Sequence, residues 1–429
     1  MKKILFFLVL SVSLFAANAQ DSVFVRNTIR DLTSPQFHGR SAAFRGDSLA
    51  ADYLAAKLKA VGAQPLTEDY LQHYTFNTCI LDGKVELALG KKKLVQGVEF
   101  SPISISKPCN GKYKMLYFDA KRIDKENEVQ QFRDEHKKAL SKSFVYLDVS
   151  DEGELNKSAL RIVNQIKRGA NPLGSAGVVL GVKSMPAMSI PANVKPMDYS
   201  VLYVKSDLMT ELPKKIKVRI DNRYACHYTQ NVAAFVPGTL CKDSMIVFMG
   251  HYDHVGQVGS VYYPGAHDNA SGTSAVLDLA RHFAHHPAKY TTVFLFFSGE
   301  ESGLMGSKFF AKNPLIDLAK VKIVVNIDLF CGGDDGIIVF NAEADNTKAV
   351  FEKMKQVNEK RGYVKDIEPR KNSANSDHYY FVERGCPAIF ILTKGGAYGG
   401  YHSPTDTCEG CRINKYNDVW NLIMETLGL

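Results

Sequence analysis

The chain has 429 residues, 45% of them apolar and 23% charged, which is enough for about two to three globular domains. Its net charge of +8 is spread along the sequence in short runs, such as residues 90–93, that are typical of solvated surface side chains. Since no basic recognition motif accompanies these runs, nucleic acid is not expected as a partner.

Residues 1–19 have the pattern of a cleaved export signal. A charged start (Lys2, Lys3) precedes an apolar run at 4–15 that is too short to cross a membrane, and a small-x-small cleavage site ends at Ala19. The mature protein is therefore expected to be secreted or periplasmic. No cysteine stands at the cleavage site and no later stretch reaches about 18 apolar residues, so no membrane anchor is expected.

Residues 20–75 are predicted to form helices that pack on a catalytic domain. The periodicity breaks at Ser34 and Pro35, resumes between Leu49 and Val61, and ends at Gly62, which is a common helix terminator.

Residues 76–224 differ in character, with short alternating runs separated by Gly, Lys and Pro. Polar helical stretches are expected at 124–141 and 160–167, and buried strands at 143–147, 176–180 and 201–204. Nothing here has the spacing of metal ligands or of a nucleophile. We interpret this segment as an inserted β-rich domain.

Residues 225–429 alternate between apolar runs and amphipathic stretches. Strands are expected at 245–249, 293–297, 323–327, 337–340 and 388–392, and helices near 271–283, 303–312, 346–360 and 416–427. This alternation predicts an α/β fold, a mostly parallel mixed sheet sandwiched by helices.

Ionisable side chains stand where these strands end. Six of them are expected at one edge of the sheet: His251, Asp268, Glu300, Glu301, Asp328 and His402. Ligands in open α/β sheets bind beyond the carboxyl ends of the strands, and acidic groups beside apolar strands are costly without a partner. The pattern therefore predicts a metal site.

Two histidines and three carboxylates suit two zinc ions if one carboxylate is shared. Asp268 is the natural bridge, because it lies between the other ligands in the sequence. One ion would take Asp268, Glu301 and His402, and the other would take Asp268, His251 and Asp328. Such a pair shares a water that attacks the substrate.

Two further carboxylates have predicted roles. Glu300 stands beside a ligand and is the expected general base. Asp253, two residues after His251, is placed to accept the N–H of that ring and to fix its tautomer.

These residues resemble the exported co-catalytic zinc peptidases that include bacterial leucyl aminopeptidase, aminopeptidase S and glutamate carboxypeptidase. The matching motifs, in order across about 230–410, are GHYDHVG, AHDNASGTSA, FFSGEESGLMGS, NIDLF, SDHYYF and YHSPTDT. The resemblance implies a zinc exopeptidase-like fold, the same five ligands, Glu300 as base, and help to the oxyanion from the Tyr401 hydroxyl. It also implies that 20–75 holds the usual N-terminal helices, that 76–224 is a protease-associated-like domain, and that 225–429 is the catalytic domain.

Some features depart from the family pattern. Leu329 replaces the more usual Met, a change of similar volume. Cys331, Cys408 and Cys411 are additional, and their pairing near the pocket would shape it. Taken alone, the CxxC of Cys408 and Cys411 favours a local disulfide or two free thiols over a redox or zinc site. His254 and His267, although next to ligands, are expected to be structural.

The function predicted from the sequence is an exported di-zinc aminopeptidase with peptide substrates, two zinc ions per chain and Glu300 as general base. A carboxypeptidase would need cationic groups for the substrate carboxylate, for which Arg370 and Lys371 are the nearby candidates. A glutaminyl cyclase of the same fold uses one zinc and lacks the ligand equivalent to His251. A non-catalytic binding module would be expected to have lost ligands, and none is lost.

Overall fold

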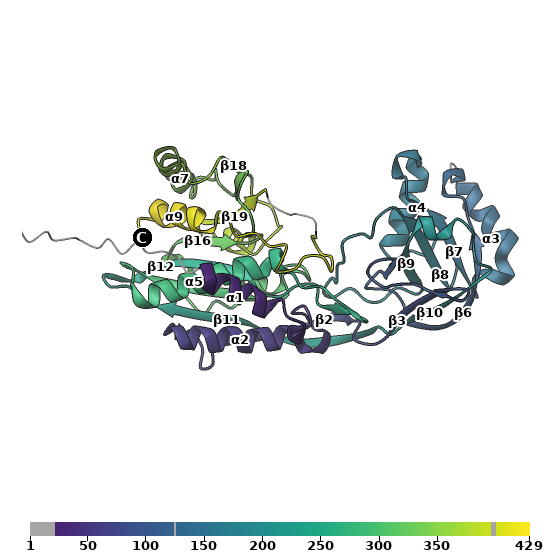
Figure 1. The fold of residues 1–429 in the computed structure, drawn as a ribbon, viewed down its shortest axis with the longest axis horizontal. Coiled ribbons are helices and arrows are strands. Elements are labelled where there is room, and N and C mark those ends of the chain that lie inside the picture. Colours follow the sequence, from purple (N-terminus) through teal and green to yellow (C-terminus); the bar gives the residue numbers. More distant parts are fainter. Residues whose placement is uncertain (1–21, 124–125, 396–399) are drawn as a thin grey trace, which may run out of the picture.

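Two sheets with separate apolar clusters organise the protein. The computed structural model describes residues 22–123, 126–395 and 400–429, so the predicted export signal lies outside the described residues. The two sheets lie toward opposite ends of an elongated molecule (Figure 1). Among the described residues, no helix combines the length and apolarity needed to cross a membrane.

The first sheet has nine strands. Eight follow in the spatial order β1 (Gln64–Pro65), β11 (Arg223–Val236), β15 (Tyr290–Phe297), β12 (Cys241–His251), β16 (Val321–Ile327), β19 (Ala388–Lys394), β17 (Gly336–Phe340) and β18 (Ile367–Arg370). The ninth, β2 (Leu71–Ile80), pairs with β11. The central strands β15, β12, β16 and β19 are parallel, while β11 and β17 pair antiparallel at either side.

Helices cover both faces of this sheet. The helices that contribute to one apolar cluster are α1 (Ser22–Leu32), α2 (Gly46–Val61), α5 (Ser271–His285), α7 (Lys348–Arg361) and α9 (Tyr416–Leu427). On the other face, α6 (Met305–Lys312) and α8 (His378–Glu383) contribute Phe310 and Phe381 to a second cluster. The predicted mixed α/β fold, with a mostly parallel sheet between helices, is confirmed.

The second sheet has eight strands. Their order is β4 (Lys92–Lys93), β3 (Val85–Leu89), β10 (Lys215–Ile220), β6 (Cys109–Tyr117), β7 (Ser143–Asp148), β8 (Gly177–Val182), β9 (Ser200–Lys205) and β5 (Phe100–Pro102). From β6 to β9 the strands are parallel and lie beside α3 (Glu126–Leu140) and α4 (Lys157–Lys167) (Figure 1). The β4-β3-β10-β6 half is antiparallel, and buried residues alternate with more exposed ones along β3 and β10.

Two long strands, β2 and β11, connect the two sheets. They pair antiparallel over ten residues, and both belong to the first sheet. The expected domain limits at 76 and 224 fall inside these strands. We therefore propose slightly narrower limits for the inserted domain, which would run from 81 to 222, after β2 and before β11. We call it the second unit, and we call the described residues up to the end of β2 and from β11 onward the first unit. A short hairpin, β13 (Gln257–Val258) and β14 (Val261–Tyr262), packs against the second unit.

The cysteines pair differently from the simplest expectation for the CxxC. Cys411 forms a disulfide with Cys331, 80 residues earlier in the sequence, and Cys408 is free. Both predictions made from the CxxC alone, a local disulfide or two free thiols, are therefore wrong, whereas the expected pairing of Cys331 with one cysteine of the CxxC is confirmed. The reason is that β16 and the segment before α9 bring these cysteines to a Cα–Cα distance of 5.5 Å, which suits a disulfide.

Candidate metal centre

Four of the predicted site residues follow neighbouring parallel strands. β12 ends at His251, Glu300 and Glu301 lie just past β15, and Asp328 directly follows β16. These strands are long uninterrupted apolar runs buried on both faces, as is usual for the centre of a parallel sheet. Because they are adjacent and parallel, their carboxyl ends meet at one edge, and the four side chains converge there.

The other two predicted ligands come from loops at the same edge. Asp268 lies in the single turn Ala266–Ala270, immediately before α5. His402 follows β19 and has a left-handed backbone with a φ of 50°. Both side chains reach the strand ends, so all six predicted residues lie in one place.

The carboxylate of Asp268 lies between the two predicted histidines. Its Oδ1 is 3.3 Å from Nε2 of His251, and its Oδ2 is 3.1 Å from Nε2 of His402. Oε2 of Glu301 is 2.8 Å from the same His402 nitrogen, while Oδ1 of Asp328 is 3.3 Å from the His251 nitrogen. The donors therefore form two groups that share Asp268.

These donors fit metal ions better than they fit hydrogen bonding with one another. Nε2 of His402 is buried and has no hydrogen-bond partner among the described residues, although two carboxylate oxygens lie within 3.1 Å. Ligands about 2.1 Å from a tetrahedral zinc lie about 3.4 Å from one another, which is close to the spacings seen here. A buried set of imidazole nitrogens and carboxylate oxygens is also what zinc prefers.

The charges of the cluster also favour a cation at its centre. Burial alone would lower the pKa of His251, but the neighbouring Asp328 and Glu300 carboxylates raise it well above its usual value. Burial alone would raise the pKa of Asp268, but the neighbouring imidazoles of His251 and His402 hold it well below its usual range. The ionised carboxylates therefore need positive charge beside them, which a protonated imidazole or a bound cation can supply.

The side chains of the adjacent residues Glu300 and Glu301 lie in different donor groups. Glu301 lies with Asp268 and His402, whereas the donor atoms of Glu300, His251 and Asp328 lie within 4.8 Å of one another. Burial raises the pKa of Glu300 well above its usual value. Glu300 is therefore placed beside the second group without being one of its predicted ligands.

The carboxylate of Asp253 orients the glutamates more directly than it orients His251. Its Oδ1 accepts a hydrogen bond from the Glu300 amide at 3.1 Å, and its Oδ2 accepts one from the Glu301 amide at 3.4 Å. Nδ1 of His251 lies 3.2 Å from the Asp253 backbone oxygen and 3.6 Å from the carboxylate. The backbone oxygen is thus the nearer acceptor for the ring N–H.

His254, which sequence reasoning left as structural, belongs to the cluster. Its Nδ1 lies 2.7 Å from Oε1 of Glu301, the oxygen that does not face His402. The histidine therefore fixes the orientation of a predicted ligand. The sequence offered one indication of this role, the position of His254 three residues after His251. That spacing is equally compatible with a histidine that only packs in the core.

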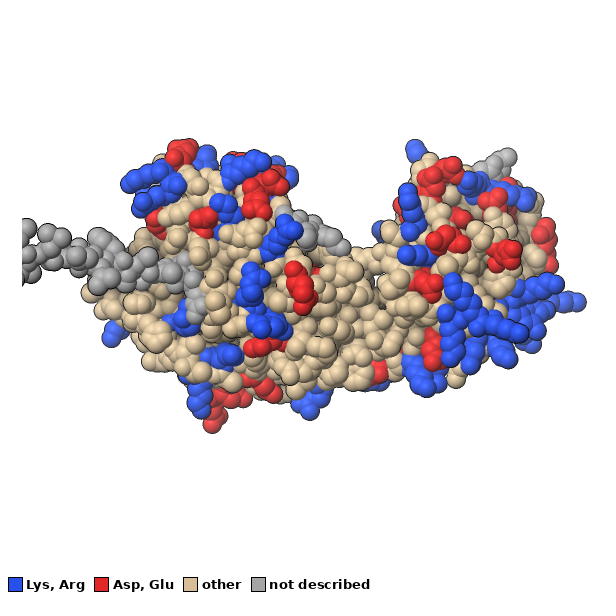
Figure 2. Space-filling view, in the orientation of Figure 1, with Lys and Arg blue, Asp and Glu red and all other residues tan. Residues whose placement is uncertain are grey.

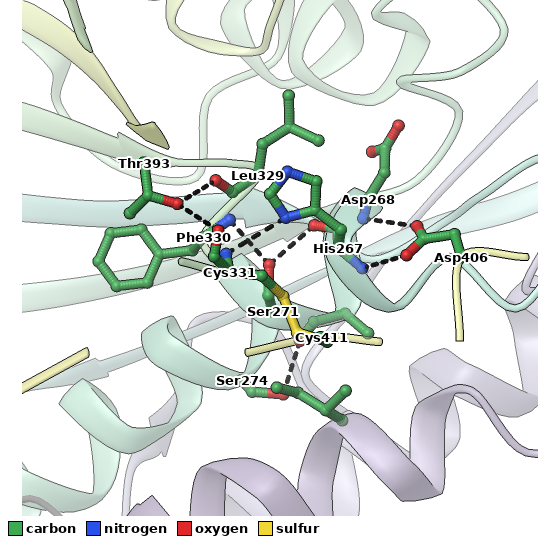
Figure 3. The surroundings of a disulfide bond; sticks show 12 residues. His267, Asp268, Ser271, Ser274, Leu329, Phe330, Cys331, Thr393, Asp406 and Cys411 are labelled. Atoms are coloured by element: carbon green, nitrogen blue, oxygen red, sulfur yellow. Dashed lines mark hydrogen bonds between the residues drawn. A yellow bond between two sulfur atoms is a disulfide. The ribbon is translucent and has the colours of Figure 1, made fainter. Parts of the chain in front are cut away.

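Asp406 supports the turn that carries Asp268 (Figure 3). Its two carboxylate oxygens accept hydrogen bonds from the backbone amides of His267, at 2.8 Å, and Asp268, at 3.1 Å. The His267 ring accepts a hydrogen bond from the Cys331 amide at 3.2 Å, beside the Cys331–Cys411 disulfide. The disulfide therefore lies beside the turn that carries Asp268.

Arg40 ties the N-terminal region to the same loops. Its buried guanidinium donates hydrogen bonds to the carbonyl oxygens of Leu32, Tyr252, Pro264 and Gly265. Burial lowers the pKa of Arg40 to about 10, although nearby carboxylates oppose this shift. The residue belongs to the FHGR stretch, whose link to the metal centre was not recognisable from the sequence.

A segment of the second unit, residues 188–193, reaches the metal centre. Nδ1 of His402 donates to the Met188 carbonyl at 2.8 Å, and the Met188 amide donates back to the His402 carbonyl at 3.1 Å. The hydroxyl of Ser302, next to Glu301, donates to the Ile190 carbonyl at 2.9 Å. The long connection between β8 and β9 therefore contacts two ligand-bearing loops.

Tyr401 lies beside His402 with half of its surface exposed. The two rings stack with centroids 3.9 Å apart. Burial of the remaining surface, together with the nearby carboxylates, raises the pKa of the Tyr401 hydroxyl well above its usual value, so the group is a proton donor at neutral pH.

Comparisons with known proteins find similarity to peptidases. Residues 231–427 match the model of Peptidase family M28. A probable zinc metalloprotease of Pyrenophora teres f. teres is 39% identical over 104 residues, which cover 23% of this chain and 22% of the relative. A probable leucine aminopeptidase of Trichophyton verrucosum is 29% identical over 202 residues, covering 44% of this chain and 54% of the relative. The matched segments thus span from about a fifth to about half of these relatives.

The fold is shared over nearly the whole chain. The structure of a zinc aminopeptidase from Bacillus subtilis superposes with a TM-score of 0.65 and 17% identity, covering 94% of this chain and 93% of the other. An aminopeptidase from Aneurinibacillus sp. strain AM-1 gives a TM-score of 0.60 at 18% identity, covering 95% and 93%. The similarity therefore includes the second unit as well as the sheet that carries the metal centre.

Proposed function

We propose that this protein is an exported aminopeptidase that uses two zinc ions to hydrolyse the N-terminal peptide bond, a proposal supported by the match of residues 231–427 to the model of Peptidase family M28. The observation that carries the proposal is the position of Asp268, with one carboxylate oxygen toward each of two donor groups. A shared carboxylate between two such groups is the arrangement of a two-metal site.

Five side chains are proposed to hold the ions. One group consists of Asp268, Glu301 and His402, and the other of Asp268, His251 and Asp328. When bound, the zinc pair would supply Lewis-acid polarisation of the scissile carbonyl and acidify the attacking water.

The remaining chemistry is assigned to the protein's own groups. Glu300 accepts a proton from the attacking water and delivers it to the leaving amine. Its backbone is fixed by Asp253, so the carboxylate stays beside the second group. The Tyr401 hydroxyl, next to His402, is placed to donate a hydrogen bond to the developing oxyanion.

The aminopeptidase is favoured over its alternatives by particular contacts. Arg370, one of the cations considered for a substrate carboxylate, is exposed on β18 and forms an ion pair with Glu368. His251, whose equivalent a single-zinc glutaminyl cyclase lacks, is present and faces Asp268. The relatives over the matched segment are named as a leucine aminopeptidase and a zinc metalloprotease.

The substitution Glu300→Gln tests the assignment. It keeps the size of the side chain and removes its basicity, so turnover of free-N-terminus peptides should fall by about 10²- to 10⁴-fold while zinc content is unchanged. Glu359→Gln, on the exposed side of α7, is the matched control and should retain full activity.

Substrate profiling in the same samples separates the alternatives. Peptides with a free N-terminus should be cleaved, and the same peptides with a blocked N-terminus should not. Cleavage that instead requires a free C-terminal carboxylate would replace the aminopeptidase assignment with a carboxypeptidase. A content of one zinc per chain would contradict the shared-ligand arrangement.

A further inference from the structure

Five lysines lie on one side of the antiparallel half of the second sheet. Lys217 of β10 stands opposite Lys112 of β6, and Lys215 stands opposite Lys114. Lys93 of β4 joins the same side, because it pairs with Ala88, which in turn pairs with Lys217. We call these five lysines the basic face.

The five lysines come from three separate stretches of the sequence and become neighbours only in the folded sheet. All five side chains are exposed, and the residues that alternate with them on β10, such as Ile216 and Val218, are buried beneath the sheet. Figure 2 shows Lys and Arg side chains concentrated over the end of the molecule where Figure 1 places β3, β10 and β6. The alternation along β10 and β6, together with Lys93 of β4, therefore places five lysines on one side of the sheet.

This arrangement works against the stability of the sheet. Like charges directly opposite each other on neighbouring strands are destabilising, and two such pairs occur here. Among the ion pairs of the described residues, none involves a lysine of the basic face; the neighbouring Arg219 and Lys92 pair with Asp221 and Glu99 instead. Since no ion pair with a described residue neutralises these five lysines, their charge is available to a partner outside.

Apolar groups border the basic face. A hollow of about 500 Å³ lies between it and the β13–β14 hairpin, lined by Lys93, Lys217 and Arg219 together with Leu94, Val95 and Val261. Val95 and Val98 leave 57% and 55% of their surface exposed in the loop after β4. Three cationic side chains and one carboxylate, Glu86, which stands opposite Arg219, thus border a site where an apolar group can be sheltered from water.

We propose that the basic face docks the protein on an anionic phospholipid surface, with the hollow beside Val95 receiving part of a lipid. The lysines form a two-dimensional array over three strands and not a single line, which matches a flat charged surface better than one extended polymer. Lysines near an anionic bilayer contribute about 1 kcal/mol each, and exposed apolar groups add to binding by entering the headgroup layer. Such docking is peripheral and needs neither a membrane-spanning helix nor the metal centre.

Vesicle sedimentation tests the proposal. The zinc-loaded protein should bind vesicles that mix phosphatidylglycerol with phosphatidylcholine and should not bind pure phosphatidylcholine vesicles. Binding should weaken as salt screens the charges. The variant K93Q/K112Q/K114Q/K215Q/K217Q should lose vesicle binding, at about fivefold per lysine removed.

A charge-matched variant controls for the overall charge. K59Q/K312Q/K320Q/K348Q/K353Q removes five exposed lysines from the first unit and should bind vesicles as the unaltered protein does. Both variants should retain peptidase activity and the circular dichroism of the unaltered protein, which shows that they fold.

Three outcomes would overturn the proposal. They are equal binding to pure phosphatidylcholine vesicles, equal loss of binding in the two variants, and binding of soluble polyphosphate by a protein that does not sediment with vesicles. The last outcome would assign the basic face to a linear polyanion. None of them bears on the peptidase assignment, which is measured separately.

Discussion

Each of the two sheets brings like charges close together, but the first sheet buries carboxylates while the second exposes lysines. At the carboxyl edge of the first sheet, five carboxylates are brought together among side chains that are almost wholly buried, such as Asp268 and Asp328 at 4% exposure each. On the second sheet, five lysines are brought together on a surface that is open to water. Both arrangements oppose folding, so each indicates a partner of opposite charge.

The difference between the regions lies in what kind of partner can reach the charge. Buried carboxylates are costly unless a positive charge lies directly beside them, and a metal ion is small enough to sit among them. An exposed lysine array is partly neutralised by water and salt, so it can wait for a partner that arrives from outside. Burial is therefore the observation that distinguishes the proposed metal centre from the proposed docking face.

Removal of zinc should have the largest effect on stability. Zinc at about a thousand times its dissociation constant stabilises the folded state by about 4 kcal/mol, and a chelator should remove this contribution. Hydrogen–deuterium exchange should then increase at β12 and β16 and stay unchanged at β7 and β8. In Asp268→Asn, which loses the charge shared by both groups, the chelator should have a much smaller effect. An equal chelator effect in that variant would contradict the role of Asp268.

His378 gives the first unit an acid sensitivity of its own. Its ring is fully buried beside Phe340 and Phe390, and neither ring nitrogen has a hydrogen-bond partner among the described residues. Burial lowers the pKa of His378 to about 4. Because the folded pKa lies below the unfolded value of about 6.5, stability is full above that value and is lost as the pH falls toward the folded pKa.

The substitution His378→Phe measures this contribution. Between about pH 7 and about pH 5 the unaltered protein should lose about 2 kcal/mol more stability than the variant. Urea titrations at the two pH values give the difference. His136→Phe, in the second unit on α3, is the control and should leave the acid sensitivity unchanged. Equal losses in the unaltered protein and His378→Phe would show that the ring is not what responds to acid.

The first sheet, and the gathering of the six ionisable side chains at its edge, could be predicted because their pattern is local in sequence. The apolar runs of β12 and β16 end at His251 and directly before Asp328, so the order of the strands indicated which side chains would meet. His254 and Asp406 could not be assigned in this way. Their roles depend on which oxygen of Glu301 faces inward and on which amides of the Asp268 turn are free, and those are properties of the folded loops.

The basic face could not be predicted because it depends on strand register. Lys112 and Lys217 are about a hundred positions apart in sequence and become neighbours only when β6 pairs with β10. A shift of that pairing by one residue would place one of them over the other face of the sheet. The pairing of Cys331 with Cys411 is a long-range contact of the same kind.

Residues 188–193 connect the second unit to the proposed metal centre. A substitution at this contact therefore tests whether the two regions act independently. Ser302→Ala removes the hydroxyl that donates to Ile190 and should weaken zinc affinity by about tenfold through looser positioning of Glu301. Competition with a chromogenic chelator measures the affinity. Ser302→Thr, which keeps the hydroxyl, should restore it, and Ser373→Ala, on an exposed loop, should have no effect. Unchanged affinity in Ser302→Ala would mean that the first unit positions its ligands alone.

The smallest effect expected is a gain in stability on the second sheet. Lys217→Thr removes one member of the Lys112–Lys217 pair and replaces it with a residue of high β propensity, so the free energy of unfolding should rise by about 0.5 kcal/mol. The gain should shrink at high salt, because screening already weakens the repulsion. The control is Lys353→Thr. Lys353 lies on helix α7 and has no cross-strand lysine neighbour, so this substitution should be neutral or slightly destabilising. A loss of stability in Lys217→Thr would show that packing of the lysine stem outweighs the repulsion, and the charge crowding would then no longer indicate an external partner.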